Sequence, residues 1–259
     1  MEAIPRTLDT LPVELLYEIY LFSLSESFPQ TNRRIHAVFC AAPSGIHAEY
    51  ILGRHLAAQA LTRSKTPIVT RALRFPLCSE SVLDALLRHP SFPSLGEPGR
   101  PTLPRRLFRT LEKNRRSQDW RSRHAPLPFL EYLYTHPSIP APDIDSHDGY
   151  PLAHAVRVGH RPLIDFLLAH GADPGRNGGL AVKLAIQRRD LQLLRVLVEP
   201  DASAGVGNRG KRRRVPDRVV LGSAHLRVAV QAQAAEVCNW LMREKGCVPD
   251  MKTFGFLRK

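Results

Sequence analysis

This chain of 259 residues lacks the long apolar segments that mark membrane-bound and secreted proteins. No run of 18 apolar residues occurs, so we expect no segment that spans a bilayer. Residues 1–11 contain acidic residues and a proline but no apolar stretch of the kind that forms the core of a secretory signal. We therefore expect an intracellular protein, cytoplasmic or nuclear, without membrane contact.

Cysteine is also scarce, because the chain contains only four: Cys40, Cys78, Cys238 and Cys247. No two of them form a C-x-x-C pair, and each lies in or beside an apolar stretch. Isolated cysteines in such surroundings are typical of small buried apolar residues rather than of metal or redox sites. We expect a reducing compartment and no metal.

Motifs of catalysis and cofactor binding are missing as well. The stretch from Gly205 to Gly210 is rich in glycine but lacks the Lys-Ser/Thr that completes a phosphate-binding loop. The dipeptide Ser44-Gly45 lacks the flanking strand of a nucleophile elbow. Histidines 36, 47 and 55 have no partners at metal-ligand spacing. The sequence therefore predicts no enzyme activity, no catalytic residue and no cofactor.

What the chain does contain is a short pattern that occurs five times. The copies begin at Val82, Phe129, Leu163, Leu193 and Val237, so they start 47, 34, 30 and 44 residues apart. Strand-type alternation is absent, whereas apolar residues recur three and four positions apart, as on one face of a helix. Repetition at this period is typical of stacked helical units, each of which buries its apolar face against its neighbours. We predict an all-α fold.

The last three copies align position by position, and each reads as two short amphipathic helices. The aligned apolar positions are Leu152, Val182 and Leu226; Ala155, Ala185 and Ala229; Val156, Ile186 and Val230; Leu163, Leu193 and Val237; Leu167, Leu197 and Leu241. The recurrent alanine predicts a first helix squeezed between its neighbours, where a larger side chain would push the axes apart. We expect His89, His136 and His170, which end three second helices, to complement the negative end of the helix dipole.

Residues 149–174 resemble an ankyrin repeat, which is a loop followed by an antiparallel helix pair. The matching residues are Gly149, Pro151, Leu152, Ala155, Gly159, His160, Leu167, Leu168, Gly171, Ala172 and Asp173. The threonine of the family's Thr-Pro-Leu-His opening is missing, and His154 lies one place late. We expect a turn at Gly159-His160 and a left-handed helix end at Gly171. The resemblance implies about five divergent repeats over 67–250; a helical-hairpin bundle of another type is the alternative.

The segment from Asp9 to Phe22 predicts a helix with Thr10 as its N-cap, Pro12 in the first turn and Glu14 near the N-terminus. Leu11, Leu15, Ile19 and Phe22 fall on one stripe of this helix. An exposed stripe of this kind is also what a helical cap over the end of a repeat array would use.

This segment resembles the opening of an F-box, through Leu11, Pro12, Glu14, Leu15, Leu16 and Ile19. The resemblance covers residues 8–52 within a predicted module of residues 1–55. It implies that Leu11, Pro12, Leu15, Leu16 and Ile19 contact the Skp adaptor of a cullin-type ubiquitin ligase. The second half departs from the family, because Asn32 to Tyr50 contains no tryptophan. A cap, an F-box relic and an unrelated module are the alternatives.

The formal net charge of +13 is concentrated in two segments. Arg100 to His124 and Arg209 to Arg218 hold almost all of the excess, and both lie where the repeat spacing is longest. We therefore predict basic insertions near 94–126 and 200–220, extruded as loops. Lys211, Arg212, Arg213 and Arg214 resemble a nuclear-import signal. Contact with nucleic acid is a weaker expectation, since aromatic residues among the arginines are sparse; solvated loops that keep the protein soluble are the plain alternative.

Together these observations predict an ankyrin-like helical-hairpin solenoid preceded by a small F-box-like helical module. The expected function is that of a non-enzymatic adaptor, in which the module recruits a Skp-type partner and the array holds a target protein for ubiquitination. The alternative is a nuclear ankyrin scaffold that is not coupled to a ligase. The sequence does not identify the target protein or the oligomeric state.

Overall fold

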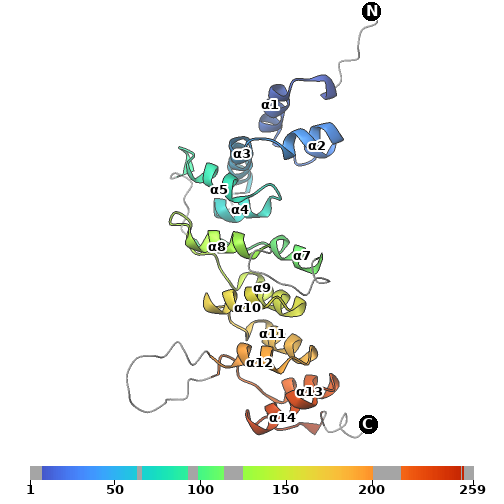
Figure 1. The fold of residues 1–259 in the computed structure, drawn as a ribbon. Helices are drawn as coiled ribbons and strands as arrows, with labels where there is room; N and C mark the ends of the chain where they lie inside the picture. The colour runs from blue at the N-terminus through green and yellow to red at the C-terminus, as the bar shows by residue number, and fades with distance from the viewer. Residues whose placement is uncertain are drawn as a thin grey trace, which may run out of the picture. The chain divides into compact units, whose positions relative to one another are not determined.

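A computed structural model describes residues 8–62, 66–92, 99–113, 125–200, 217–251 and 253. Over these ranges the regular structure is helical (Figure 1), and the β-type pairing is a single bridge between Thr102 and Asp143. The prediction of an all-α fold is therefore confirmed. The chain forms two compact units: Met1–Pro104 with Phe129–Asp143, and Arg105–Pro128 with Ile144–Lys259.

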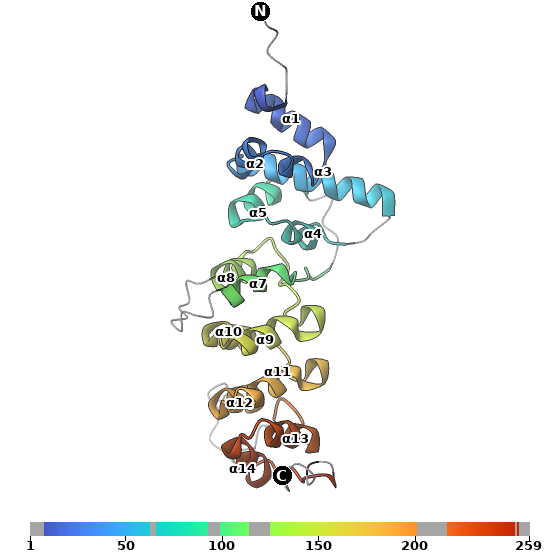
Figure 2. The same ribbon diagram turned by 90° about the vertical axis from the view of Figure 1, so that its right-hand side faces the viewer.

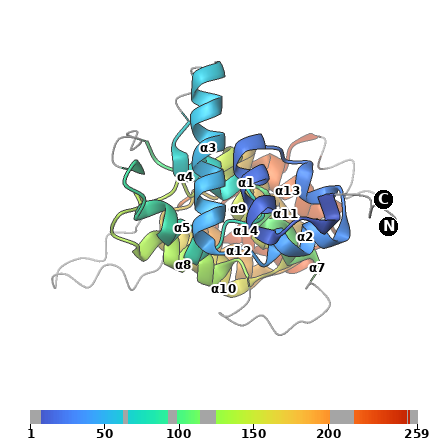
Figure 3. The same ribbon diagram turned by 90° about the horizontal axis from the view of Figure 1, so that it is seen from above.

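The first unit is organised around α3, a helix of 19 residues that contacts α1, α4 and α5 (Figure 3). Its elements are η1 (Leu8–Thr10), α1 (Val13–Ser23), η2 (Phe28–Gln30), α2 (Arg33–Cys40), α3 (Ser44–Thr62), α4 (Ile68–Arg74), α5 (Glu80–Leu87) and most of α8 (Leu127–Thr135). The boundaries of these units differ from those of the predicted domains 1–55 and 67–250. Helix α3 continues to Thr62 and packs on α1 from the first predicted domain and on α4 and α5 from the second.

Aromatic rings fill the core between α1, α2 and α3. The rings of Tyr20 and Tyr50 stack with centroids 4.0 Å apart, and Phe39 lies 4.3 Å from Tyr20. All three side chains are buried. Burial and the neighbouring Tyr50 hydroxyl raise the pKa of Tyr20 well above its ordinary range, so the phenol stays neutral. These contacts fix α1 to α3 through one side of α1.

The second unit contains three helix pairs that follow one another. Its helices are α7 (Arg106–Lys113), α9 (Ser146–Val158), α10 (Arg161–Ala169), α11 (Arg176–Gln187), α12 (Leu191–Val198), α13 (Ser223–Gln231) and α14 (Ala235–Arg243). The first helices pack in succession, α9 on α11 and α11 on α13, and each also contacts the second helix of its own pair. Figure 2 shows α9, α11 and α13 on one side of this unit and α10, α12 and α14 on the other.

The burial of aligned residues confirms the predicted register, except at Val230, which is half-buried where Val156 and Ile186 are fully buried. Ala155, Ala185 and Ala229 are all 0% exposed on the first helices. On the second helices, the two aligned apolar positions are at most 1% exposed: Leu163, Leu193 and Val237, then Leu167, Leu197 and Leu241. A methyl group is the largest side chain that lets α11 lie between α9 and α13 at this position.

Each pair turns through one left-handed residue, at Gly159, Arg189 and Gln233, with φ of 86°, 58° and 54°. The N–H group of the residue that follows then donates to the carbonyl of the aligned, buried alanine of the same pair, as the His160 N–H does to the Ala155 carbonyl at 3.1 Å. This turn satisfies a carbonyl that the helix end would otherwise leave unpaired. The turn predicted at Gly159-His160 is confirmed, and it recurs twice without glycine.

The second helices of two pairs begin with a side-chain cap. The His160 Nδ1 accepts a hydrogen bond from the Leu163 N–H at 3.1 Å, and the Asp190 Oδ1 accepts one from Leu193 at 2.9 Å. Histidine and aspartate therefore occupy aligned positions in the two pairs, and each acts as the N-cap of its second helix. The family resemblance places His160 in the turn, and the structure shows why an acceptor is useful there.

A left-handed turn also opens α9 and α11, and the sequence patterns did not predict it. Asp148 and Gly149 have φ of 62° and 75°, and Gly178 and Gly179 have 60° and 71° at the aligned positions. A Cβ on Gly149 would lie 2.7 Å from the Cβ of Arg176 in the next repeat. Glycine is required here both for its backbone conformation and for the close approach of the following loop.

Two of the recurrent histidines make a local hydrogen bond that the sequence patterns did not predict. The Nδ1 of His89 accepts a hydrogen bond from the Ser91 N–H, and the Nδ1 of His136 accepts one from Ser138, each at 3.2 Å. Each of these rings closes a His-Pro-Ser turn beyond the end of its helix. His170 differs, because its Nδ1 lies 2.8 Å from the Phe166 carbonyl oxygen. The His-Pro-Ser triplet, which occurs at both places in the sequence, is the signal that could have predicted these two turns.

We predict that Gly149→Ala destabilises the second unit more than Gly171→Ala does. Both glycines have positive φ, 75° and 87°, but nothing lies within 4 Å of a Cβ on Gly171. Gly171→Ala therefore pays only for the left-handed backbone, about 1–2 kcal/mol. Gly149→Ala adds a steric clash of about 1–3 kcal/mol. Thermal unfolding of both variants measures the difference, and equal melting temperatures would contradict the role given to Arg176.

Candidate functional site

Helix α1 has one face in the core and one face in solvent. Leu16 and Tyr20 are 0% and 1% exposed, and they hold the helix on the rest of the first unit. Val13, Leu15 and Phe22 are 36%, 43% and 87% exposed, although all three are large apolar residues. Leu8 in η1 is exposed as well. Leu15 and Phe22, seven residues apart, lie on the same side of α1, whereas Val13 lies almost opposite Leu15. Because apolar side chains of this size gain roughly 1.5–3 kcal/mol each from full burial, Leu15 and Phe22 are the candidates for contact with a partner.

The structure separates the five predicted partner-binding residues into two groups. Leu15 and Pro12 are exposed, and Leu11 and Ile19 are half-buried, so these four reach the surface. Leu16 does not reach it, and we reassign this residue to the core. Its position next to Leu15 in sequence puts it about 100° further round the helix, on the face toward α3. We call Leu15 and Phe22 the α1 apolar surface.

The start of α1 also differs from the prediction. Pro12, not Thr10, occupies the N-cap position, and no side chain there makes a capping hydrogen bond. Thr10 belongs to the short η1 helix that precedes it. Glu14 lies in the first turn, as predicted, where a negative charge is favoured.

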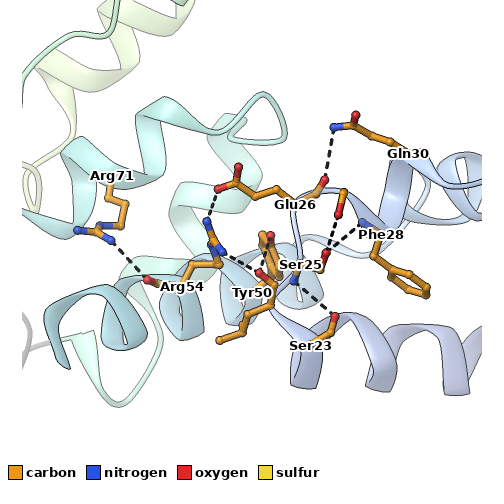
Figure 4. Close-up of polar contacts among 10 residues, drawn as sticks. Ser23, Ser25, Glu26, Phe28, Gln30, Tyr50, Arg54 and Arg71 are labelled. Atoms are coloured by element: carbon orange, nitrogen blue, oxygen red, sulfur yellow. Dashed lines mark hydrogen bonds and ion pairs between the residues drawn. The ribbon is translucent and has the colours of Figure 1, made fainter. Parts of the chain in front are cut away.

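Arg54 of α3 fixes the chain where α1 ends (Figure 4). Leu24 ends α1 in a left-handed conformation, with φ of 48°. The Arg54 Nη1 donates to the Leu24 carbonyl at 2.9 Å, its Nη2 pairs with Glu26, and the Tyr50 hydroxyl also points to the Leu24 carbonyl. One guanidinium therefore holds both the turn and the following segment. The direction in which α1 projects its apolar surface depends on this contact.

Local hydrogen bonds shape the segment between α1 and α2. The Ser25 hydroxyl accepts from the Phe28 N–H at 3.2 Å, and the Gln30 amide donates to the Glu26 carbonyl (Figure 4). Asn32 then caps α2, because its side chain accepts from the Arg34 N–H at 2.8 Å. Hydrogen bonds from short polar side chains thus stabilise the connection between α1 and α2.

The basic segments are only partly described. Lys211, Arg212, Arg213 and Arg214 lie outside the described residues, as do 94–98 and 114–124 of the insertion predicted near 94–126. The described part of that insertion contains helix α7, so it is not the loop that the sequence predicted. Of the first cluster, Arg100 and Arg109 are exposed, and Arg105 lies over the Tyr150 ring at 5.1 Å. Arg105 is therefore engaged in a contact within the second unit.

The two ends of the 200–216 segment are held together by one ammonium group. The Lys245 Nζ lies 3.0 Å from a Glu199 carboxylate oxygen and 2.9 Å from one of Asp217. Burial acts to lower the pKa of Lys245, but hydrogen bonds to Asp217 and Glu199 outweigh it and raise the pKa. The Arg218 N–H also donates to the Val198 carbonyl at 2.8 Å. The chain therefore leaves α12 and returns toward α13 at one place.

His225 at the start of α13 is buried against the preceding repeat. Its Nδ1 accepts from the Gly222 N–H at 3.3 Å, and its Nε2 would lie 3.0 Å from a Cβ on Gly179. Burial, with Lys183 as a second cause, lowers the pKa of His225 below its ordinary 6.5. The folded protein therefore holds this ring in its neutral form.

Within the described ranges, no group of three or more His, Cys, Asp or Glu side chains has an arrangement suited to a metal ion. Helices long and apolar enough to cross a membrane are not found in the described part of the chain.

Comparison with known proteins gives no relative from which to transfer a function. No protein-family model, no curated protein and no solved structure matches this chain.

We predict that Arg54→Met destabilises the first unit by about 1–2 kcal/mol, because the variant loses a charge-assisted hydrogen bond to the Leu24 carbonyl. The value is at the lower end of the usual range, since the Arg54 side chain is 34% exposed. Glu26→Gln should cost less than about 1 kcal/mol, because Glu26 is 63% exposed. Denaturant titration distinguishes the two variants, and an equal loss would show that the ion pair rather than the carbonyl contact matters.

We predict that His225 makes the second unit less stable in mild acid. Because its pKa is lower in the folded protein, its contribution is full above the unfolded pKa of about 6.5 and is lost as the pH falls below that value. His225→Asn keeps an acceptor near the Gly222 N–H but cannot titrate. Melting temperatures between pH 7 and pH 5 should fall more steeply for the wild type than for this variant. Parallel curves would contradict the assignment.

Proposed function

We propose that this protein is a non-enzymatic interaction adaptor in which the α1 apolar surface binds a Skp-type adaptor of a cullin ubiquitin ligase. The observation that carries the proposal is the division of α1 into a packed face and an exposed apolar face. Leu16 and Tyr20 account for the packing of the helix, so packing within the unit does not explain Leu15 and Phe22. A partner that covers these side chains does explain them.

The F-box-like reading of residues 8–52 adds the identity of the partner. The Leu-Pro-x-Glu-Leu-Leu-x-x-Ile spacing from Leu11 to Ile19 is the family's core, and three helices, α1, α2 and α3, occupy this part of the chain. Four of the five residues that the resemblance assigns to the adaptor reach the surface. Leu16 is the exception, because its side chain is buried.

The ankyrin-like reading of the helix pairs supports a role in holding a second protein. The pairs α9–α10, α11–α12 and α13–α14 share one turn geometry and one buried alanine, as a stack of identical units requires. Repeats of this kind present a continuous surface along successive first helices. We propose that this surface holds the protein to be ubiquitinated, while the ligase that the adaptor recruits supplies the chemistry.

The test is retention of the purified Skp adaptor by the full chain. We expect Leu15→Asp to weaken binding by more than about tenfold, because a charge replaces an apolar side chain that the partner would bury. Leu61→Asp is the matched control: Leu61 is 85% exposed, but it lies near the far end of α3, outside the F-box-like residues. Both variants should melt as the wild type does.

Two results would overturn the ligase proposal. One is failure of the wild type to retain the Skp adaptor, which would leave a scaffold that is not coupled to a ligase. The other is equal retention by the wild type and Leu15→Asp. A loss with Leu61→Asp as large as with Leu15→Asp would move the contact to α3.

A further inference from the structure

The two junctions between successive helix pairs of the second unit differ in the side chains that lie beside their turns. Between α9–α10 and α11–α12, the side chain of Arg188 extends back over the preceding turn. Its Nη1 donates to the Arg157 carbonyl at 2.9 Å, and its Nη2 would lie 2.5 Å from a Cβ on Gly159. The space beside this turn is therefore occupied by a guanidinium group of the next repeat.

At the following junction the same position holds alanine. The aligned turn alanines, Ala185 and Ala229, set the register, so Ala232 corresponds to Arg188 and Gln187 corresponds to Arg157. A hollow of about 280 Å³ lies here, lined by Gln187, Arg189, Val228, Gln231 and Ala232. At this junction the left-handed residue aligned with Gly159 is Arg189, and Arg189 is among the residues that line the hollow.

The charge of this edge is positive. The turn segments 157–161, 187–190 and 231–234 contain four arginines and one aspartate. That aspartate, Asp190, is already used, because it pairs with Arg161 at 2.7 Å and caps Leu193. The Arg189 side chain, by contrast, makes no hydrogen bond or ion pair with the described part of the chain, and it lines the hollow together with two glutamine amides. These are donor groups that suit a carboxylate.

We infer that this hollow binds the side-chain carboxylate of an acidic segment of the protein that the helix pairs hold. The inference rests on the proposed function and adds the chemistry that selects the target. Arg189 pairs with the carboxylate, the amides of Gln187 and Gln231 donate to it, and Val228 with Ala232 contacts its aliphatic stem.

Size and lining favour an acidic peptide over nucleic acid. A volume of about 280 Å³ is below the usual range of small-molecule pockets and suits one side chain. No aromatic residue lines the hollow, so a base has no ring to stack on. The aliphatic wall also matches the methylene groups of glutamate better than a phosphate.

The test uses two blocked heptapeptides, one of sequence Gly-Ser-Glu-Leu-Glu-Ser-Gly and one with glutamine in place of both glutamates. NMR titration of the full chain follows the Gln231 side-chain amide and the Arg189 Nε–H. We expect the glutamate peptide to shift both signals and to bind at least about tenfold more tightly than the glutamine peptide. Equal affinities of the two peptides would overturn the inference.

Two variants make the test specific to the hollow. Ala232→Glu places a carboxylate of the protein beside Arg189, so it should compete with the peptide and abolish its binding; thermal unfolding checks that the variant is folded. Arg189→Glu should reverse the preference, so that a lysine counterpart of the peptide binds better than the glutamate peptide. Undiminished binding of the glutamate peptide by folded Ala232→Glu would overturn the inference.

The remaining controls separate this inference from competing explanations. A short thymidine oligonucleotide that binds more tightly than the glutamate peptide and displaces it would reassign the edge to nucleic acid and overturn the inference. Leu15→Asp should bind the peptide as the wild type does, and Ala232→Glu should retain the Skp adaptor as the wild type does. Failure of the hollow and failure of the adaptor proposal are therefore distinguishable.

Discussion

The close approach of successive first helices is the constraint on which the second unit depends. Ala155, Ala185 and Ala229 stand where these helices pack, and each is completely buried. The same alanine supplies the carbonyl that closes the turn into the second helix, as Ala155 does for His160. One small residue thus determines both the spacing between pairs and the geometry within a pair. Everything placed on the turns, from the caps of the second helices to the side chains that reach the neighbouring repeat, follows from this spacing.

The helices and their register could be predicted from sequence because burial repeats in the pattern of apolar residues. Leu163, Leu193 and Val237 align in sequence and are equally buried in the structure. Features that depend on one side chain meeting a distant one could not be predicted in this way. The left-handed residues Arg189 and Gln233 carry no sequence signal of their own, since glycine is the usual sign of that conformation. Their conformation is maintained by the hydrogen bonds of the turn rather than by local preference.

The candidate surface on α1 shows a similar limit. Periodicity identifies an amphipathic helix but does not say which apolar residues face the core, when both faces contain them. Leu15 and Leu16 are chemically identical neighbours, yet one is 43% exposed and the other is 0% exposed. The difference is decided by Tyr20, which joins Leu16 on one face and stacks on Tyr50 of α3. Arg54 adds a second constraint from α3 by fixing the turn at Leu24, a contact between residues 30 positions apart that no local pattern reveals.

The ionic contact at Lys245 determines how far the length of the 200–216 segment affects the neighbouring helices. Glu199 and Asp217 both pair with its ammonium group. The two flanks of the 200–216 segment are therefore held together by a contact outside that segment. The entropy of closing a loop grows only with the logarithm of its length, and each doubling costs about 0.6 kcal/mol. Residues inserted into or deleted from this stretch should therefore leave α12 and α13 in register. We therefore expect changes in the length of the arginine-rich stretch to have little effect on the stability of α12 and α13.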